Sequence, residues 1–328
     1  MVSVIKPSSK QVQTSKKILP CPVCSSKESK LMGKHGKYLL LDCGSCGLRY
    51  SSPMQEPPNE FYTGSYLYNY RTKTTLAKDL ANSMLRRDWR FRTAIADISK
   101  RIKKTKGEKI LDVGCGEGGF LYLLKERGFS VFGVDIDQRG VEIAKKDFGL
   151  QNVKVVAWQE LPKLNWQNTF SVVTLFDTLE HVSDPLQLLR FISSLLADNG
   201  CLYISVPSYE RQPRLFDPEA DFPPHHLTLW TRKGLEIALE KTGFKKMQII
   251  EKPFGGEDLQ LHFIWWLKRR RSEGKQDKKA NEKTFVTRPS AAKAFLKSLS
   301  LVSFKLLAGL IKFGGTNRGQ TYLVIAQK

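Results

Sequence analysis

Apolar residues in the middle of the chain fall into short runs of strand length that alternate with stretches of helical periodicity. These runs predict strands near 108–113, 129–135, 152–157, 170–176 and 200–206, and two more at 244–251 and 321–327. The helical stretches lie near 118–128, 138–148, 184–197 and 231–242, the last ending before Gly243, a typical C-cap residue. Such alternation is typical of an α/β fold with a doubly wound parallel sheet.

The first predicted strand runs directly into a turn that is rich in glycine. Residues 110–120 read Ile-Leu-Asp-Val-Gly-Cys-Gly-Glu-Gly-Gly-Phe, with glycines at 114, 116 and 118. We expect a Cβ at these positions to fill space that a nucleotide-like cofactor needs. The next strand ends at Asp135, whose carboxylate can accept hydrogen bonds from both hydroxyls of a ribose. Together the loop and the acid predict a nucleoside pocket.

Two details of this loop favour S-adenosylmethionine over a dinucleotide. The third glycine follows the second by two residues, whereas the dinucleotide fingerprint has three. Asp112 also precedes the first glycine, and its carboxylate repels a pyrophosphate but attracts an ammonium or a sulfonium.

Three segments carry a resemblance to a known family: 111–118 (Leu-Asp-Val-Gly-Cys-Gly-Glu-Gly), 133–136 (Gly-Val-Asp-Ile) and 176–182 (Phe-Asp-Thr-Leu-Glu-His-Val). Over about residues 75–251 and the final strand, the chain resembles class I S-adenosylmethionine-dependent methyltransferases. The resemblance implies a Rossmann-like sheet of seven strands, the last antiparallel. The predicted cofactor-binding residues here are Asp112, Gly114, Cys115, Gly116, Gly118, Asp135, Ile136, Phe176 and Asp177.

The segment after the third strand departs from the family pattern. Resembling enzymes often place an acid there, against the adenine amino group, but this chain has Trp158 and Gln159. We expect Gln159 to replace the acid as an acceptor. Trp158 is predicted either to stack on the adenine or to pack in the core.

Histidines supply the candidate catalytic groups. Glu180-His181 matches a pair that resembling enzymes hold beside the sulfonium methyl, and an imidazole with a pKa near 6.5 suits a general base. The alternative is a histidine that only caps or packs a helix start. The resemblance places Pro224-His225-His226 over the substrate pocket, where we expect His226 to contact the substrate or assist the base. A metal site at His225 and His226 is disfavoured, because no carboxylate is suitably spaced and the resemblance implies no metal.

The loop between the fifth strand and these histidines is predicted to form a lid lined by Tyr209, Arg211, Arg214 and Phe216. The alternative is a solvated linker.

The N-terminal part carries a sharper pattern. Cys21-x-x-Cys24 and Cys43-x-x-Cys46 are separated by eighteen residues, which predicts a structural zinc site with four thiolate ligands. Two disulfides are the alternative. They are disfavoured because the first residues lack the apolar core of a signal peptide, which favours a reducing, cytoplasmic compartment. Cys115 and Cys201 are expected to be buried and unpaired.

Positive charge concentrates at the two ends of the chain. The net charge is +21, of which residues 1–46 carry +6 and residues 264–328 carry +12. Basic flanks predict an anionic partner: substrate phosphates, a membrane surface or, less favoured, nucleic acid. The segment 268–283 is equally well explained as a disordered connector.

Two amphipathic stretches, 261–267 and about 290–313, flank that connector, and neither is long enough to span a bilayer. We expect them to dock on the sheet or on a second subunit, with the inner face of the membrane as the alternative. The sequence leaves the oligomeric state open.

These patterns divide the 328 residues into four parts. They are a flexible N-terminus (1–18), a zinc ribbon (19–52), the methyltransferase domain (75–256 with 314–328) and a basic amphipathic helical insertion (257–313). The predicted activity is methyl transfer to an oxygen or carbon nucleophile of a small or amphiphilic metabolite, such as a glycan, glycolipid or natural-product precursor.

Two alternatives come from other classes. An RNA methyltransferase would use the ribbon and basic flanks, but the chain has Phe-Asp-Thr-Leu at 176–179 instead of an Asn-Pro-Pro-Tyr-like motif. A non-catalytic scaffold would keep the fold only, but the intact loop and acids argue against it.

Overall fold

Seven strands form the large sheet, and those at its centre, such as β7 and β8, are apolar enough to be covered on both faces. In the computed structural model their order is β10-β11-β8-β7-β4-β5-β6. The strands are β4 (Lys109–Val113), β5 (Ser130–Asp135), β6 (Val153–Val155), β7 (Phe170–Phe176), β8 (Leu196–Pro207), β10 (Lys245–Glu251) and β11 (Thr321–Gln327). Strands β4 to β8 pair in parallel, and β11 lies antiparallel between β8 and β10. The predicted doubly wound, seven-stranded sheet with an antiparallel last strand is confirmed.

The structure describes residues 19–58, 61, 88–102, 108–211, 221–252 and 319–328. The predicted N-terminal tail, both amphipathic stretches and the lid positions Arg214 and Phe216 lie outside this part of the chain. Across the described ranges, no helix combines the length and the apolarity needed to cross a membrane.

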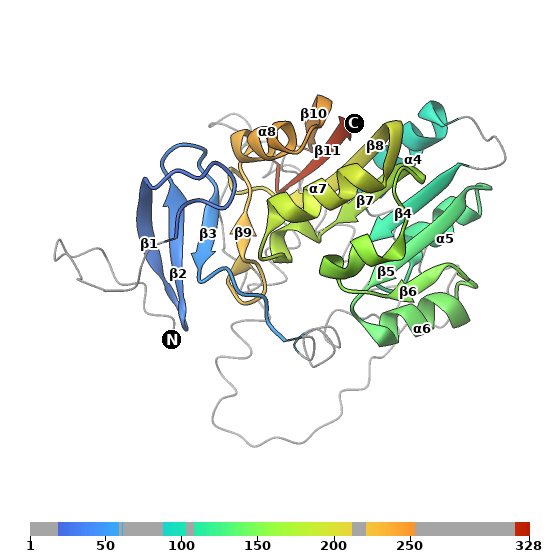
Figure 1. Cartoon of the computed structure of the whole chain (residues 1–328), viewed down its shortest axis with the longest axis horizontal. Helices are drawn as coiled ribbons and strands as arrows, with labels where there is room; N and C mark the ends of the chain where they lie inside the picture. The colour runs from blue at the N-terminus through green and yellow to red at the C-terminus, as the bar shows by residue number, and fades with distance from the viewer. Residues whose placement is uncertain (1–18, 59–60, 62–87, 103–107, 212–220, 253–318) are drawn as a thin grey trace, which may run out of the picture.

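Helices cover both faces of the sheet (Figure 1). The predicted helices are present as α5 (Gly119–Lys125), α6 (Gln138–Lys146), α7 (Pro185–Leu195) and α8 (Arg232–Lys241). The side chains of Asp137, Asp184 and Thr231 each accept a backbone hydrogen bond at the start of α6, α7 and α8, so the sequence encodes these helix starts. Two hydrophobic clusters result, one beneath α7 and α8 and the other beneath α5 and α6.

Helix α4 (Trp89–Arg101) was missing from the sequence prediction. A signal for it exists, because Asp88 caps its first turn and its buried residues Phe91, Ala94, Ile95 and Ile98 follow helical spacing. Basic residues between these positions weaken the apolar pattern.

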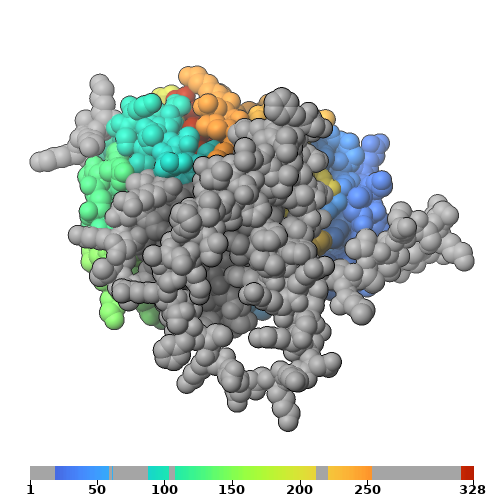
Figure 2. All heavy atoms as spheres, turned by 180° about the vertical axis from the view of Figure 1, so that it is seen from behind, coloured from blue at the N-terminus to red at the C-terminus, as the bar shows by residue number. Residues whose placement is uncertain are grey.

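A second, antiparallel sheet contains the N-terminal cysteines. Its order is β1 (Ser29–His35), β2 (Tyr38–Cys43), β3 (Arg49–Ser52) and β9 (Thr228–Leu229). The first three strands belong to residues 19–52, called the ribbon below, whereas β9 comes from the segment between β8 and α8. Figure 1 shows β9 beside β3, and Figure 2 shows the blue ribbon and the green end of the large sheet on opposite sides of the molecule. Ribbon residues such as Leu41 and Tyr50 share one core cluster with Trp230 and Leu235.

Candidate functional site

The three loop glycines all have positive φ angles, of +81° at Gly114, +52° at Gly116 and +78° at Gly118. A Cβ added to Gly116 would meet nothing within 4 Å, whereas one on Gly114 would run into Thr178 and one on Gly118 would lie 2.5 Å from Leu150 Cδ1. The expectation that all three leave room for a cofactor is therefore corrected. Only Gly116 faces open space, and the other two are required by packing within the protein.

Two carboxylates flank this loop. Asp112 is buried, and the Thr174 hydroxyl donates to its Oδ1 over 2.6 Å. Burial raises the pKa of Asp112 to about 7, against the opposing hydrogen bond from Thr174. In the described part of the chain no lysine or arginine pairs with Asp112. A buried carboxylate with no cationic partner fits a ligand that brings its own positive charge.

Asp135 lies beside the loop and is held by it. Its Oδ2 accepts a hydrogen bond of 2.7 Å from the Gly116 backbone N–H, and its Oδ1 accepts one of 2.8 Å from Asp137. Burial raises the pKa of Asp135, while these backbone donors oppose the shift. A carboxylate has about four acceptor positions, so Asp135 keeps acceptor capacity beyond its backbone donors. Ile136 is half-buried next to it, and the buried, unpaired Cys115 packs against the strand at Gly133.

The segment after β6 is organised by Glu56, which sequence reasoning missed. Trp158 Nε1 donates to Glu56 Oε1 over 2.9 Å, and Gln159 Nε2 donates to Glu56 Oε2 over 3.2 Å. Trp158 is buried in the core cluster and packs near Phe191, as the packing alternative expects. Its stacking on adenine remains a prediction. Because the Gln159 amide nitrogen is engaged, its oxygen is left as an acceptor.

Phe176 and Asp177, at the end of β7, lie in different surroundings. The Phe176 ring packs against Phe91 and Phe120, with centroids 5.0 and 4.6 Å away. Asp177 adopts φ +51°, and its Oδ1 accepts from Arg90 Nη1 over 2.5 Å. Burial alone would lower the pKa of Arg90, but Asp177 and Asp88 outweigh it and raise the pKa. Arg90 belongs to α4, so it was missed together with that helix.

The three candidate catalytic histidines come together, although they are 44 and 45 residues apart in sequence. The His181 ring centroid lies 4.5 Å from that of His225 and 4.9 Å from that of His226. His181 Nδ1 donates to the His225 carbonyl over 2.7 Å, which fixes the orientation of the ring. Burial lowers the pKa of His181 well below its usual value, and the neighbouring histidines add to the shift. This shift favours the neutral imidazole.

Two carboxylates approach His226. Glu180 Oε1 lies 4.0 Å from His226 Nε2, and Asp221 Oδ1 lies 3.5 Å from His226 Nδ1. Glu180 is fully buried with no hydrogen bond to either side-chain oxygen among the described atoms, and burial raises its pKa well above the usual range. Burial also acts to raise the pKa of Asp221, but His226 and the ion pair with Arg211 outweigh it and lower the pKa.

The expectation that no carboxylate is suitably placed for a metal site at His225 and His226 is therefore wrong. The fold brings His181 and two carboxylates to the His225-His226 pair, and the ligand atoms of the three histidines lie within 4.8 Å of one another. The cluster can hold an acceptor molecule or a metal ion.

The predicted lid residues that are described contact the rest of the molecule. The Tyr209 hydroxyl donates to Asp42 Oδ2 over 2.6 Å, and the Arg49 guanidinium lies 4.5 Å above the Tyr209 ring. Both Asp42 and Arg49 belong to the ribbon, which therefore anchors the start of this loop.

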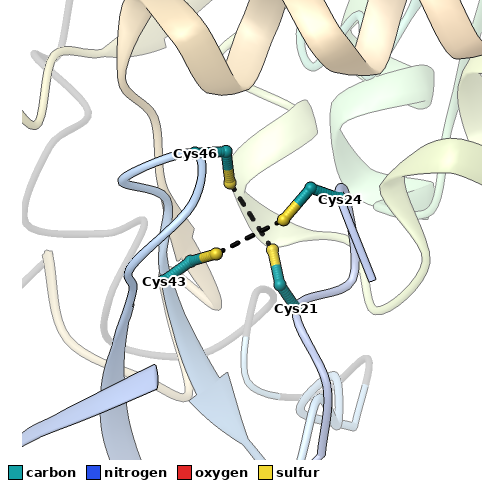
Figure 3. A group of neighbouring side chains, drawn as sticks. All are labelled: Cys21, Cys24, Cys43 and Cys46. Carbon is teal, nitrogen blue, oxygen red and sulfur yellow. Dashed lines mark hydrogen bonds between the residues drawn. The ribbon is translucent and has the colours of Figure 1, made fainter. Parts of the chain in front are cut away.

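The four N-terminal cysteines form one cluster (Figure 3). The Sγ atoms of Cys21 and Cys46 are 3.6 Å apart, and those of Cys24 and Cys43 are 3.3 Å apart. A tetrahedral zinc site with Zn–S bonds of about 2.3 Å requires sulfurs about 3.8 Å apart. The Cys46 thiol lowers the pKa of Cys21 to about 5 against the effect of burial. All four cysteines are free, so the cluster fits zinc and contains no disulfide.

A doubly wound sheet with an open glycine turn flanked by Asp112 and Asp135 is typical of proteins that bind a nucleoside cofactor. Residues 85–249, half of the chain, match the family described as Methyltransferase domain. The chain belongs to the S-adenosylmethionine-dependent methyltransferases. The fitting residues and the family together imply S-adenosylmethionine as the cofactor.

Curated relatives support the same family. The ubiquinone biosynthesis O-methyltransferase of Haemophilus ducreyi is 35% identical over 107 residues, which are 30% of this chain and 45% of that protein. The protein of the same name from Histophilus somni is 31% identical over 120 residues, which are 34% of this chain and 50% of that protein. The chain spans about half the length of these relatives.

A solved structure from Galdieria sulphuraria, named as a methyltransferase, superposes with a TM-score of 0.50 at 15% identity. The match covers 82% of this chain and 97% of that one, and it supports the fold alone.

Proposed function

We propose that this methyltransferase methylates an oxygen nucleophile of a small or amphiphilic metabolite. One observation carries the proposal: the turn that leads to His181 packs directly on the glycine loop. The Thr178 hydroxyl donates to the Val113 carbonyl over 3.1 Å, and Thr178 fills the space beside Gly114. The histidine cluster therefore lies next to the loop that is expected to hold the methyl donor.

Methyl transfer is an in-line displacement, so the protein has to align the acceptor and remove its proton. Bound S-adenosylmethionine supplies an electrophilic methyl group on a positively charged sulfur. Asp112, Gly116 and Asp135 would hold it by charge, by open space and by ribose hydrogen bonds. Toward the acceptor, His181 is the general base that removes the proton. The Asp221 carboxylate, near His226 Nδ1, supplies negative charge that stabilises a proton gained by the cluster.

The names of the curated relatives support an oxygen acceptor on a small molecule. A carbon nucleophile activated by proton removal would use the same histidines. The predicted classes of glycan, glycolipid or natural-product precursor, the cytoplasmic location and the contact of basic flanks with an anionic membrane surface belong to this proposal.

The test is incubation of the protein with methyl-labelled S-adenosylmethionine and a host extract, followed by separation of RNA, lipid and soluble fractions. We expect the label in a lipid or soluble metabolite, and product analysis to place it on oxygen. Label in RNA alone would support the RNA methyltransferase alternative. Label in no fraction would support the scaffold alternative.

A further inference from the structure

Glu56 lies in the segment that leaves the ribbon after β3, yet its carboxylate sits among loops of the large sheet. Its Oε1 accepts hydrogen bonds from Trp158 Nε1 (2.9 Å), the Ser183 backbone N–H (2.7 Å) and the Ser183 hydroxyl (2.8 Å), and its Oε2 accepts from Gln159 Nε2 (3.2 Å). Trp158 and Gln159 follow β6, and Ser183 follows β7. One carboxylate therefore joins two strand-end loops that are separate in sequence.

These loops adjoin the acid that is expected to bind the ribose. The backbone N–H of Val156, at the end of β6, donates to the Asp135 carbonyl over 2.9 Å. The family resemblance implies that a nucleoside whose ribose lies against Asp135 places its base near residues 157–159, and these residues come next along the same edge of the sheet. Adenine presents an amino group at this edge, and that donor requires an acceptor.

Gln159 has no acidic neighbour in its own segment to fix its orientation, since Glu160 pairs with Lys163 over 2.9 Å. Glu56 fixes it instead. A carboxylate only accepts hydrogen bonds, so Glu56 binds the amide nitrogen of Gln159. The amide oxygen of Gln159 then points away from Glu56. All four donors to Glu56 are uncharged, and among the described residues no lysine or arginine pairs with it. Its negative charge therefore also favours an amino donor nearby.

We propose that Glu56 is a positioning residue for adenine: it holds Gln159 so that the pocket accepts a 6-amino purine and rejects a 6-oxo purine. The inference rests on the proposed function, because it concerns the methyl donor. It also makes the ribbon a contributor to cofactor recognition, because only three residues separate Glu56 from the end of β3.

The test compares binding of S-adenosylhomocysteine with binding of its 6-oxo analogue, S-inosylhomocysteine, by calorimetry on the full chain. We expect the wild type to prefer the adenine ligand by at least about tenfold, because an oxo group facing an acceptor leaves that acceptor unpaired. Glu56→Gln should reduce this preference to about twofold or less, since a glutamine side chain can present a donor to Gln159 and release its orientation.

Glu160→Gln is the matched control, because it removes a neighbouring exposed acid, and it should leave the preference unchanged. Gln159→Leu should reduce the preference to about twofold or less, as Glu56→Gln does, and combining the two changes should reduce it no further. This non-additive pattern separates positioning from a loss of stability, which would weaken both ligands by the same factor.

The inference is overturned if Glu56→Gln leaves the ratio of the two affinities at the wild-type value, whether or not both affinities fall. A wild type that binds neither ligand overturns it together with the proposed function. A wild type that shows the expected ratios but methylates no acceptor overturns the proposed function alone.

Discussion

Asp112 gives the sharpest quantitative prediction, because it is buried without a cation in the described part of the chain. Burial raises its pKa from 3.8 to about 7. Each pKa unit is about 1.4 kcal/mol, so the ionised carboxylate costs the ligand-free protein about 4 kcal/mol above pH 7. The folded state binds this proton more tightly than the unfolded state. The stability that the folded protein gains by keeping Asp112 protonated is therefore fully present below about pH 4 and is lost as pH rises through about 7.

Asp112→Asn removes this cost and can keep the hydrogen bond from Thr174. The new amide hydrogens are buried and need acceptors, which reduces the gain. We expect the ligand-free variant to be about 1 to 3 kcal/mol more stable than the wild type at pH 8, with a gap that shrinks toward pH 5. The same variant should lose affinity for S-adenosylmethionine although it gains stability. We expect the loss to be about 10- to 100-fold at pH 8, because the carboxylate no longer attracts the positive charge of the ligand.

Denaturant unfolding of ligand-free protein from pH 5 to pH 8, with calorimetric titration of S-adenosylmethionine, measures both effects. Wild-type affinity should rise with pH through about 7, whereas the affinity of the variant should lack this rise. Asp198→Asn, an exposed change at the start of β8, is the control and should alter neither quantity. A variant that is no more stable than the wild type at pH 8, or a gap that does not depend on pH, would refute the reasoning.

Three further predictions concern the loop, the histidines and the thiolates. Gly116→Val should abolish binding of S-adenosylhomocysteine, because the side chain fills the open space beside the loop. Gly118→Ala should mainly lower stability, because its Cβ meets Leu150. Near-normal affinity of Gly116→Val for S-adenosylhomocysteine would show that the loop is not part of the binding site. His181→Ala should slow turnover by about 10²- to 10⁴-fold with nearly unchanged affinity for S-adenosylhomocysteine, and unchanged kcat would discard it as the base. Metal analysis should find one zinc per chain in the ribbon, lost in Cys21→Ser. Since β3 pairs with β9 directly after the histidine loop, that variant should also lose turnover. A fully active, zinc-free variant would contradict this coupling.

The sequence predicted the large sheet well, because its central strands are apolar on both faces and end in turns of distinctive composition. Strand β7 was placed at its observed bounds. The four cysteines were predicted to cluster because their spacing is local and their chemistry is specific.

The remainder of the site depends on contacts between distant segments. Glu56 meets Trp158 across 102 positions, and Arg90 meets Asp177 across 87, so no local pattern marks either residue. Strand β9 has two residues, too few for a periodic signal, and it is a strand only because β3 lies beside it. The separate roles of the loop glycines could not be predicted, because they depend on which atoms lie opposite each Cα.

The central claim is that the glycine loop between Asp112 and Asp135 binds S-adenosylmethionine. The most direct measurement is competition calorimetry on the full chain with S-adenosylmethionine, S-adenosylhomocysteine and NAD. We expect one S-adenosylmethionine per chain, displaced by S-adenosylhomocysteine and unaffected by NAD. Binding of NAD in place of S-adenosylmethionine, or binding of neither, would contradict it.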